Sequence, residues 1–214
     1  RLDDGTTMLL DSLKGDFEEA GILVKKTGES TLSYSAENLP QQAQLAYNTI
    51  EVPKGAEFDL ILSDGTRVWL NADSKLKYPV TFGNDKREVE LEGEGYFKVT
   101  KDERKPFRVV VKKQTVEVLG TEFNIKCYSD ETALVTTLVN GKVKFDDGIN
   151  PSVILKPEEQ LIFEKENSQS IVRKVNVNHY ISWKDNRLSF QGETLDMIMK
   201  TLSRWYNVEV VFED

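Results

Sequence analysis

The sequence has few of the residues that build covalent or metal-centred sites. Its only cysteine is Cys127 and its only histidine is His179. One cysteine cannot form an internal disulfide, and Cys127 follows Phe123 and Ile125 at a period of two, which predicts a small core residue. One histidine without nearby cysteines excludes the usual zinc spacings and a catalytic triad. We therefore expect His179 to be a surface or linker residue and the chain to bind no transition metal.

Long apolar runs are also missing, and acidic residues outnumber basic ones. No stretch approaches the roughly 18 apolar residues of a membrane-spanning helix, and no signal peptide is evident. The net charge is −8, which repels phosphate backbones and argues against nucleic-acid binding. The chain opens at Arg1 rather than at a methionine. We therefore expect a piece of a longer protein, with any anchor or export segment outside it.

What the sequence does have is a hairpin pattern between residues 58 and 70. Asp64-Gly65 is a turn signal between two apolar runs. A two-residue loop would scatter the apolar side chains over both faces, whereas a three-residue loop at 63–65 collects them on one. That face holds Phe58, Leu60, Leu62, Val68 and Leu70. Since a buried face fixes register, we predict the three-residue loop, with Gly65 at its left-handed position.

Alternating patterns continue through most of the chain. The clearest covers residues 88–100, where apolar residues point one way while glutamates and Tyr96 point the other, as in a half-buried strand. Asn140-Gly141 is the strongest signal for a two-residue hairpin, and residues 157–160 predict another. About a dozen short strands precede the first convincing helix, which favours a mainly β fold. We expect many short antiparallel strands in a β-sandwich or a flattened, solenoid-like body.

The first 47 residues repeat part of this pattern. Asp3-Asp4-Gly5 echoes the loop at residues 63–65, and the same loop length would place Leu2, Met8 and Leu10 on one face. Two short strands are expected at 22–24 and 31–34, followed by a polar, glutamine-rich segment that contains one proline. We therefore assign residues 1–47 to an N-terminal β extension and linker, and residues 48–178 to an all-β domain.

The pattern changes after Trp183. Residues 187–190 and 208–212 are expected to be strands, and a helix is expected between them. Thr194 is its predicted N-cap, and Asp196 in the first turn suits the helix dipole. An apolar stripe at helical spacing should face the sheet; it consists of Leu195, Ile198, Met199 and Leu202. This small βαβ segment occupies residues 179–214.

No pattern points clearly to catalysis. Residues 92–95 are glycine-rich but precede a strand, so they do not form a phosphate-binding loop. The glutamates of residues 88–94 have the spacing of paired glycosidase carboxylates, although a solvated sheet face also explains them. Aromatic residues, among them Trp69 and Tyr96, gather in the central stretch, where packing between sheets or sugar stacking would explain them. A carbohydrate-binding β module and a glycosidase-like enzyme therefore stay open as alternatives.

The central motifs resemble those of the FecR family of anti-sigma regulators. The matching stretches, in order, are Val52-Pro53-Lys54-Gly55, residues 62–74, Tyr78-Pro79, residues 87–97, Lys105-Pro106-Phe107, residues 118–124 and residues 138–143. The end of the chain, residues 183–190 and 202–212, is similar to the start of the STN-like domain that closes these proteins. The variety most like this sequence regulates SusC-like glycan importers.

This resemblance implies a non-enzymatic sensor without cofactors or catalytic residues. It implies the periplasmic region of a single-span inner-membrane protein, with an all-β FecR-like domain at 48–178 and the first half of an STN-like domain at 179–214. The expected partner is the periplasmic signalling domain of a TonB-dependent outer-membrane transporter. An extracytoplasmic-function sigma factor would bind a cytoplasmic segment outside this sequence. Asp64, Gly65, Asn140 and Gly141 are expected to be structural turn residues.

The predicted βαβ segment also suggests where a partner binds. A short sheet leaves unpaired backbone donors and acceptors at its edges, and an added strand can pair with them. We therefore expect the partner surface to include the apolar residues of the two predicted strands, namely Leu188, Phe190, Val208, Val210 and Phe212. Packing of this segment on the β body is the alternative interpretation.

Overall fold

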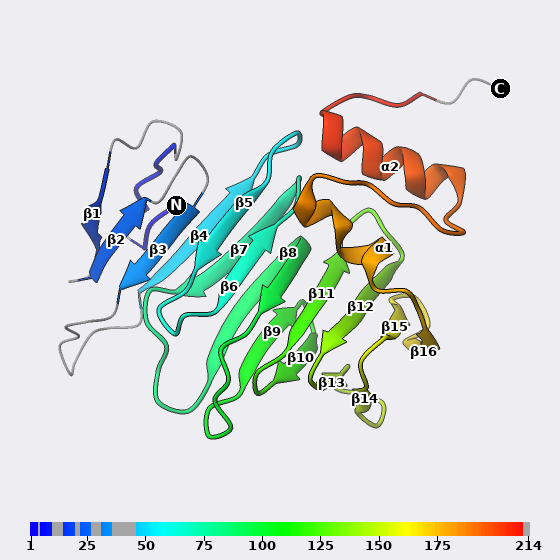
Figure 1. Ribbon diagram of the computed structural model, residues 1–214, viewed down its shortest axis with the longest axis horizontal. Helices are drawn as coiled ribbons and strands as arrows, with labels where there is room; N and C mark the ends of the chain where they lie inside the picture. The colour runs from blue at the N-terminus through cyan, green and yellow to red at the C-terminus, as the bar shows by residue number, and fades with distance from the viewer. Residues whose placement is uncertain (4, 10–14, 20–21, 27–30, 36–45, 212–214) are drawn as a thin grey trace.

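The computed structural model covers residues 1–214 and describes residues 1–3, 5–9, 15–19, 22–26, 31–35 and 46–211. Its strands form two sheets that share β8 (Figure 1). The first sheet runs through β1 (Phe17–Glu19), β2 (Ile22–Lys26), β3 (Thr31–Ser35), β5 (Phe58–Ile61), β6 (Arg67–Leu70), β8 (Arg87–Lys98), β11 (Glu122–Cys127), β12 (Ala133–Asn140), β15 (Glu159–Glu164) and β16 (Gln169–Lys174). The second contains β4 (Tyr47–Val52), β7 (Ser74–Pro79), β8, β9 (Phe107–Val111), β10 (Gln114–Val118), β13 (Val143–Asp146) and β14 (Val153–Leu155).

The strand β8 joins the two sheets. Its first half pairs with β7 and β9, and its second half pairs with β6 and β11. Gly93 lies where the strand passes from one sheet to the other, with φ at +94°. A Cβ added there would lie 2.6 Å from the Cα of Ser74. A larger residue would strain the backbone and overlap the neighbouring strand, so the sequence has glycine at this crossing.

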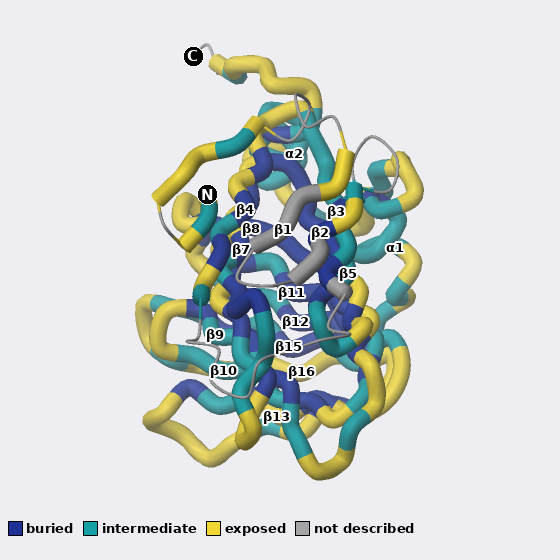
Figure 2. Tube along the Cα trace, turned by 90° about the vertical axis from the view of Figure 1, so that its left-hand side faces the viewer, coloured by how far each residue is buried: buried dark blue, intermediate teal, exposed yellow. Residues whose placement is uncertain are grey.

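The core lies between the sheets and is rich in phenylalanine. Phe97 stacks on Phe123 with ring centroids 5.2 Å apart, and it also approaches Phe107 of the second sheet at 6.2 Å. Phe145 of β13 meets Phe163 of β15 at 5.4 Å. Figure 2 shows the buried positions along the inner strands. The prediction of a mainly β fold built from many short antiparallel strands is confirmed.

The hairpin between β5 and β6 has the register that the apolar pattern predicts. Leu60 pairs with Val68, and the Leu62 amide donates to the Thr66 carbonyl at 2.9 Å, which leaves a three-residue loop. Gly65 has φ at +80°. Asp64 has a second role that the sequence did not reveal. Its Oδ2 accepts a hydrogen bond from Nη1 of the buried Arg87 at 2.8 Å, so the loop is fixed to β8.

The N-terminal loop has the same hydrogen bonds. The Leu2 amide donates to the Thr6 carbonyl at 2.9 Å, and the Gly5 amide donates to the Leu2 carbonyl at 3.0 Å. Leu2 and Met8 are half-buried, while the third residue of the predicted face, Leu10, lies outside the described residues. The strands β2 and β3 form where expected, and β3 pairs in parallel with β5. The N-terminal strands therefore continue the first sheet.

Two predicted hairpins are wrong. β12 is already paired with β11 and β15, so the chain after Asn140-Gly141 cannot pair back and crosses to the second sheet as β13. Gly141 still has φ at +95°, which fits a sharp turn. The segment at residues 157–160 crosses in the opposite direction, from β14 to β15. In both places the sequence correctly indicates a turn. The flanking strands nevertheless pair with other strands rather than with each other, because strand pairing depends on residues far away in sequence.

The outer face of β8 is also more buried than predicted. The side chains of Glu94 and Tyr96 were expected in solvent, but these residues are only 7% and 4% exposed. The reason is the segment after β16, where α1 (Asn178–Ile181) and the short helix η2 (Ser182–Asp185) lie over the first sheet (Figure 1). Trp183 of η2 is buried against this face.

The helix predicted near the C-terminus is present as α2 (Leu195–Tyr206). Thr194 caps it by accepting a hydrogen bond from the Met197 amide, and Asn207 ends it in the left-handed conformation. The flanking strands are not present. Residues 187–190 and 208–211 form no strand, because no described strand lies beside them to complete a ladder, and Phe212 lies outside the described residues.

The apolar stripe of α2 consequently has no sheet to face. Leu195 is 64% exposed, and Ile198, Met199 and Leu202 are only partly buried. The prediction that these residues form a core is therefore wrong for the described chain. None of the described helices is long and apolar enough to cross a membrane.

Candidate interaction surface

Arg204 attaches α2 to the β body. It is the buried residue of this helix, and its Nη1 donates to Oε1 of Glu131 at 2.7 Å. Its Nη2 donates to Oδ1 of Asp130, and its guanidinium carbon lies 3.6 Å from the ring centroid of Tyr128. Lys126 also pairs with Glu131 at 3.1 Å. The loop between β11 and β12 thus forms an acidic and aromatic socket for one arginine.

Trp183 provides the second attachment through a network of buried amides. Its Nε1 donates to Oδ1 of Asn124 at 3.2 Å. Asn124 and Asn71 each donate a side-chain hydrogen bond to the Glu94 carboxylate, both at 2.9 Å. Burial raises the pKa of Glu94, while Lys126 and the two amides oppose this shift. The C-terminal segment therefore packs on a polar layer rather than on the apolar core.

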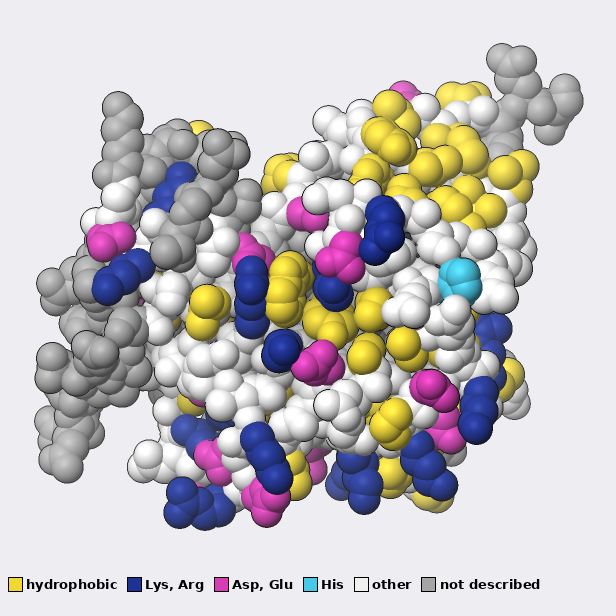
Figure 3. Space-filling model, viewed as in Figure 1, with side chains coloured by type: hydrophobic (Ala, Val, Ile, Leu, Met, Phe, Trp, Pro, Cys, Tyr) yellow, Lys and Arg dark blue, Asp and Glu magenta, His cyan; other side chains and the backbone are white. Residues whose placement is uncertain are grey.

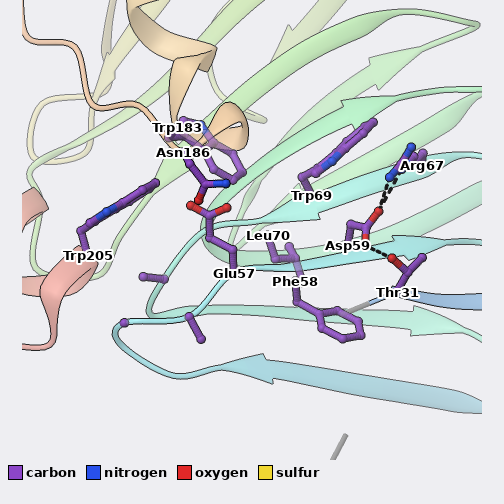
Figure 4. Close-up of a pocket in the computed structure, with 13 residues that line it drawn as sticks. Thr31, Glu57, Phe58, Asp59, Arg67, Trp69, Leu70, Trp183, Asn186 and Trp205 are labelled. Carbon is purple, nitrogen blue, oxygen red and sulfur yellow. Dashed lines mark hydrogen bonds and ion pairs between the residues drawn. The ribbon is translucent and has the colours of Figure 1, made fainter. Parts of the chain in front are cut away.

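A hollow of about 520 Å³ lies between the β body and this segment. All three tryptophans of the chain line it, Trp69 from β6, Trp183 from η2 and Trp205 from α2. Figure 4 shows Trp69 and Trp205 on opposite sides, with Glu57 and Trp183 between them. We call it the tryptophan hollow. Its size is that of an ordinary ligand site.

Two carboxylates in the tryptophan hollow differ in their partners. Asp59 accepts hydrogen bonds from Arg67 and from the Thr31 hydroxyl. Glu57 has no such partner among the described residues, and its Oε1 is shielded from solvent. Burial, together with the nearby charge of Glu94, raises the pKa of Glu57 to about 7. An acid in this environment is ready to ionise when a positive group approaches.

Apolar side chains form an exposed patch over α2 and its flanks, seen at the upper right of Figure 3. Leu195 is 64% exposed, and Val211 is 74% exposed. We use the name C-terminal apolar surface for the exposed apolar residues of α2 and of the segments on either side of it, namely Phe190, Leu195, Tyr206, Val208 and Val211. Exposed apolar residues that gather in this way mark interaction sites more often than solitary ones do.

The predicted partner residues fall on two sides of α2. Leu188 and Phe190 line a small depression beside His179, whose Nδ1 lies 2.5 Å from the Ser189 hydroxyl. Val208 and Val210 line a second hollow beside the last turn of α2. The structure therefore brings these two pairs to one helix but not to one sheet. Asp64, Gly65 and Gly141 lie in turns or bends of the β body, and Asn140 is the last residue of β12.

The structure gives little support to the two alternatives, a carbohydrate-binding module and a glycosidase-like enzyme. Tyr96 is buried and packs edge-on against Trp69 at 5.5 Å, so these rings do not form an open, flat platform for a sugar. Glu90 pairs with Lys77 on the exposed surface, whereas Glu94 is buried beneath Trp183. The carboxylates of β8 therefore do not share one cleft.

Sequence reasoning missed Glu57, Glu131 and Arg204. Their importance comes from contacts between segments about 70 or more residues apart, such as the pair between Arg204 and Glu131. One signal was available, since Arg204 and Trp205 follow each other at the end of a helix whose apolar stripe lies elsewhere. The pattern alone does not show that Trp69, Trp183 and Trp205 meet.

Comparisons with known proteins agree with this architecture. The family model "FecR protein" matches residues 48–144, and the model "FecR, C-terminal" matches residues 187–214. A crystal structure of a protein from Parabacteroides distasonis that is assigned as an anti-sigma factor is 34% identical, with a TM-score of 0.73, and the match covers 76% of each chain. A second crystal structure with the same assignment and organism gives the same identity and TM-score over 78% of this chain and 81% of that one. No curated protein matches the chain.

Proposed function

Because the chain belongs to the FecR family of anti-sigma factors, we propose that it is the periplasmic region of a membrane-anchored regulator. It receives a signal from a TonB-dependent, SusC-like outer-membrane transporter and relays it to an extracytoplasmic-function sigma factor. The membrane span and the sigma-binding segment lie outside this sequence. The relay needs only protein-protein contacts, so the chain acts without catalytic residues or a cofactor.

The observation that supports this proposal is the C-terminal apolar surface. A helix attached by a buried arginine, with exposed apolar side chains at both of its ends, Leu195 and Tyr206, is arranged to bind another protein. The signalling domain of the transporter is the proposed partner. Its contacts include Leu188, Phe190, Val208, Val210 and Phe212. Residues 187–190 and 208–211 pair with no described strand. The backbone of Val208 is bonded to Ser203 and the Arg187 amide to the Ser182 carbonyl, so a strand of the partner would add to residues 188–190 or 209–211.

A capture experiment tests the proposal. The chain is immobilised and exposed to purified periplasmic signalling domains of TonB-dependent transporters from the organism that makes it. Transporters of the same class that lack a signalling domain serve as controls. We expect one or a few signalling domains to bind with dissociation constants of about 10 μM or tighter, as transient signalling contacts do. Failure of every signalling domain to bind would contradict the proposal.

A further inference from the structure

We propose that the tryptophan hollow is a binding site for a cationic side chain, a lysine or an arginine supplied by a protein partner. The site consists of the Glu57 carboxylate with Trp69, Trp183 and Trp205 around it. A carboxylate combined with aromatic faces is the arrangement that recognises organic cations. The inference rests on the proposed function, because it assumes a protein partner, and it adds the chemistry by which that partner is recognised.

The chain already binds two of its own arginines in this way. The guanidinium carbon of Arg67 lies 4.4 Å from the ring centroid of Trp69, and its nitrogens donate to Asp59. Arg204 combines the Tyr128 ring with the carboxylates of its socket. The tryptophan hollow has the same two components, aromatic rings and a carboxylate, but no described residue supplies the cation for Glu57.

The charges around Glu57 favour a cation over other ligands. The charged groups that line the hollow are Glu57, Asp59 and Arg67, with Glu94 close behind. Arg67 is already engaged by Asp59, so it does not neutralise Glu57. An anionic ligand would be repelled. A neutral sugar would leave Glu57 protonated and form no ion pair, whereas a lysine or arginine would pair with the ionised carboxylate.

A bound side chain would also connect the two parts of the protein. Glu57 and Trp69 belong to the β body, whereas Trp183 and Trp205 belong to the C-terminal segment. A cation held between them would contact both, and its binding free energy would stabilise the packing of α2. The tryptophan hollow would thus connect partner binding with the attachment of this helix.

Tryptophan fluorescence tests this inference directly, because every tryptophan of the chain lines the hollow. The probes are two acetylated and amidated pentapeptides with arginine or lysine between glycine pairs. Their matched controls carry citrulline or acetyl-lysine, which keep the shape but lose the charge. We expect a saturable fluorescence change with the cationic peptides and at least about tenfold weaker binding of the neutral ones.

Two variants test whether peptide binding depends on the Glu57 carboxylate. Glu57→Gln should weaken binding of the arginine peptide at least about tenfold, whereas Glu166→Gln, an exposed carboxylate outside the hollow, should leave it unchanged. Binding by the unaltered chain should strengthen between about pH 6 and pH 8 as Glu57 ionises, and Glu57→Gln should lose this dependence. Circular dichroism of both variants checks that they are folded.

Two outcomes would overturn the inference. One is equal binding of cationic and neutral peptides, or preference for a neutral oligosaccharide tested in parallel. The other is unchanged peptide binding by Glu57→Gln. The capture experiment is read separately. If transporter signalling domains bind the chain while the cationic peptides do not, the inference is wrong and the proposed function stands; if the peptides bind but no signalling domain does, the proposed function fails.

Discussion

Nη1 of Arg204 lies 2.7 Å from Oε1 of Glu131, and the two side chains are only 5% and 6% exposed. This contact joins the C-terminal helix to the loop between β11 and β12. Arg204 is also the buried residue of α2, and its carbonyl accepts a hydrogen bond from the Gly55 amide at 2.8 Å. Loss of this side chain should therefore loosen the attachment of the helix, while the backbone bond to Gly55 can persist.

Replacement of Arg204 by alanine should destabilise the protein strongly. It removes one of the two cations that pair with the buried Glu131, the other being Lys126, which should cost about 3 kcal/mol, the lower end for a broken buried pair. Urea unfolding measures the loss, and hydrogen exchange should show faster exchange of the α2 amides. Lys200→Ala is the control on the same helix, because its pair with Asp196 and its 3.4 Å hydrogen bond to the Asp130 carbonyl are both exposed and together contribute less than about 1 kcal/mol. Equal stability of the two variants would show that the socket does not hold the helix.

Stability should also depend on the ionisation of Glu57. Its pKa in the folded protein is about 7, raised from 4.5, so folding favours the protonated form. This contribution is fully present below about pH 4.5 and is lost as pH rises through 7. Glu57→Gln mimics the protonated acid. It should match the unaltered protein near pH 4.5 and exceed its stability above pH 8 by about 1–2 kcal/mol, because solvent near a half-buried carboxylate reduces the effect.

Urea unfolding at several pH values measures this difference. Glu166→Gln, which alters an exposed carboxylate, should show no comparable change with pH. A difference between the Glu57 variant and the unaltered protein that is constant from about pH 4.5 to pH 8.5 would contradict the raised pKa.

Substitutions of Gly65 in the loop at residues 63–65 should lower stability by amounts that depend on how well the new residue adopts a positive φ. Gly65 has φ at +80°, and an added Cβ would lie 3.3 Å from the Thr100 hydroxyl oxygen. Gly65→Val should destabilise the protein by about 1–3 kcal/mol, the usual effect of a forced backbone conformation. Gly65→Asn should cost less, since asparagine adopts the left-handed region more readily. Thermal unfolding ranks the two; equal stability would remove the argument from backbone strain.

The thiol of Cys127 should not react with alkylating reagents in the folded protein. It is 3% exposed, and burial raises the pKa of its thiol to about 12. Iodoacetamide reacts with the thiolate, so alkylation at pH 8 should be negligible until urea unfolds the chain. Mass spectrometry follows the reaction. Rapid labelling of the native protein would mean that the core around β11 opens readily.

The strands of the body were predictable because their pattern is local. The face shared by Leu60, Leu62 and Val68 allows one loop length, and the structure has it. The helix α2 was equally readable from its cap at Thr194 and its end at Asn207. In both cases the structure is determined by the residue types within about a dozen neighbouring positions. Patterns of this length can be recognised in a single sequence.

The features that could not be predicted depend on contacts between residues far apart in the sequence. Glu94 and Tyr96 alternate like solvent-facing residues, and only the C-terminal segment buries them. Asn140-Gly141 has the chemistry of a hairpin, yet β12 already has partners on both edges. Residues 187–190 have the composition of a strand but lack a neighbour in the described chain. The tryptophan hollow depends on such contacts as well, since its residues come from segments far apart in sequence.

The central claim is that a transporter signalling domain binds the C-terminal apolar surface, and calorimetric titration of such a domain into three versions of the chain tests it most directly. These are the unaltered chain, Val208→Asp on this surface and Ile171→Asp on β16, where the replaced residues are 48% and 59% exposed. We predict that Val208→Asp weakens binding at least about tenfold, because it places a charge in an apolar contact, whereas Ile171→Asp binds like the unaltered chain. Equal affinity of all three, or weaker binding only by Ile171→Asp, would contradict the account.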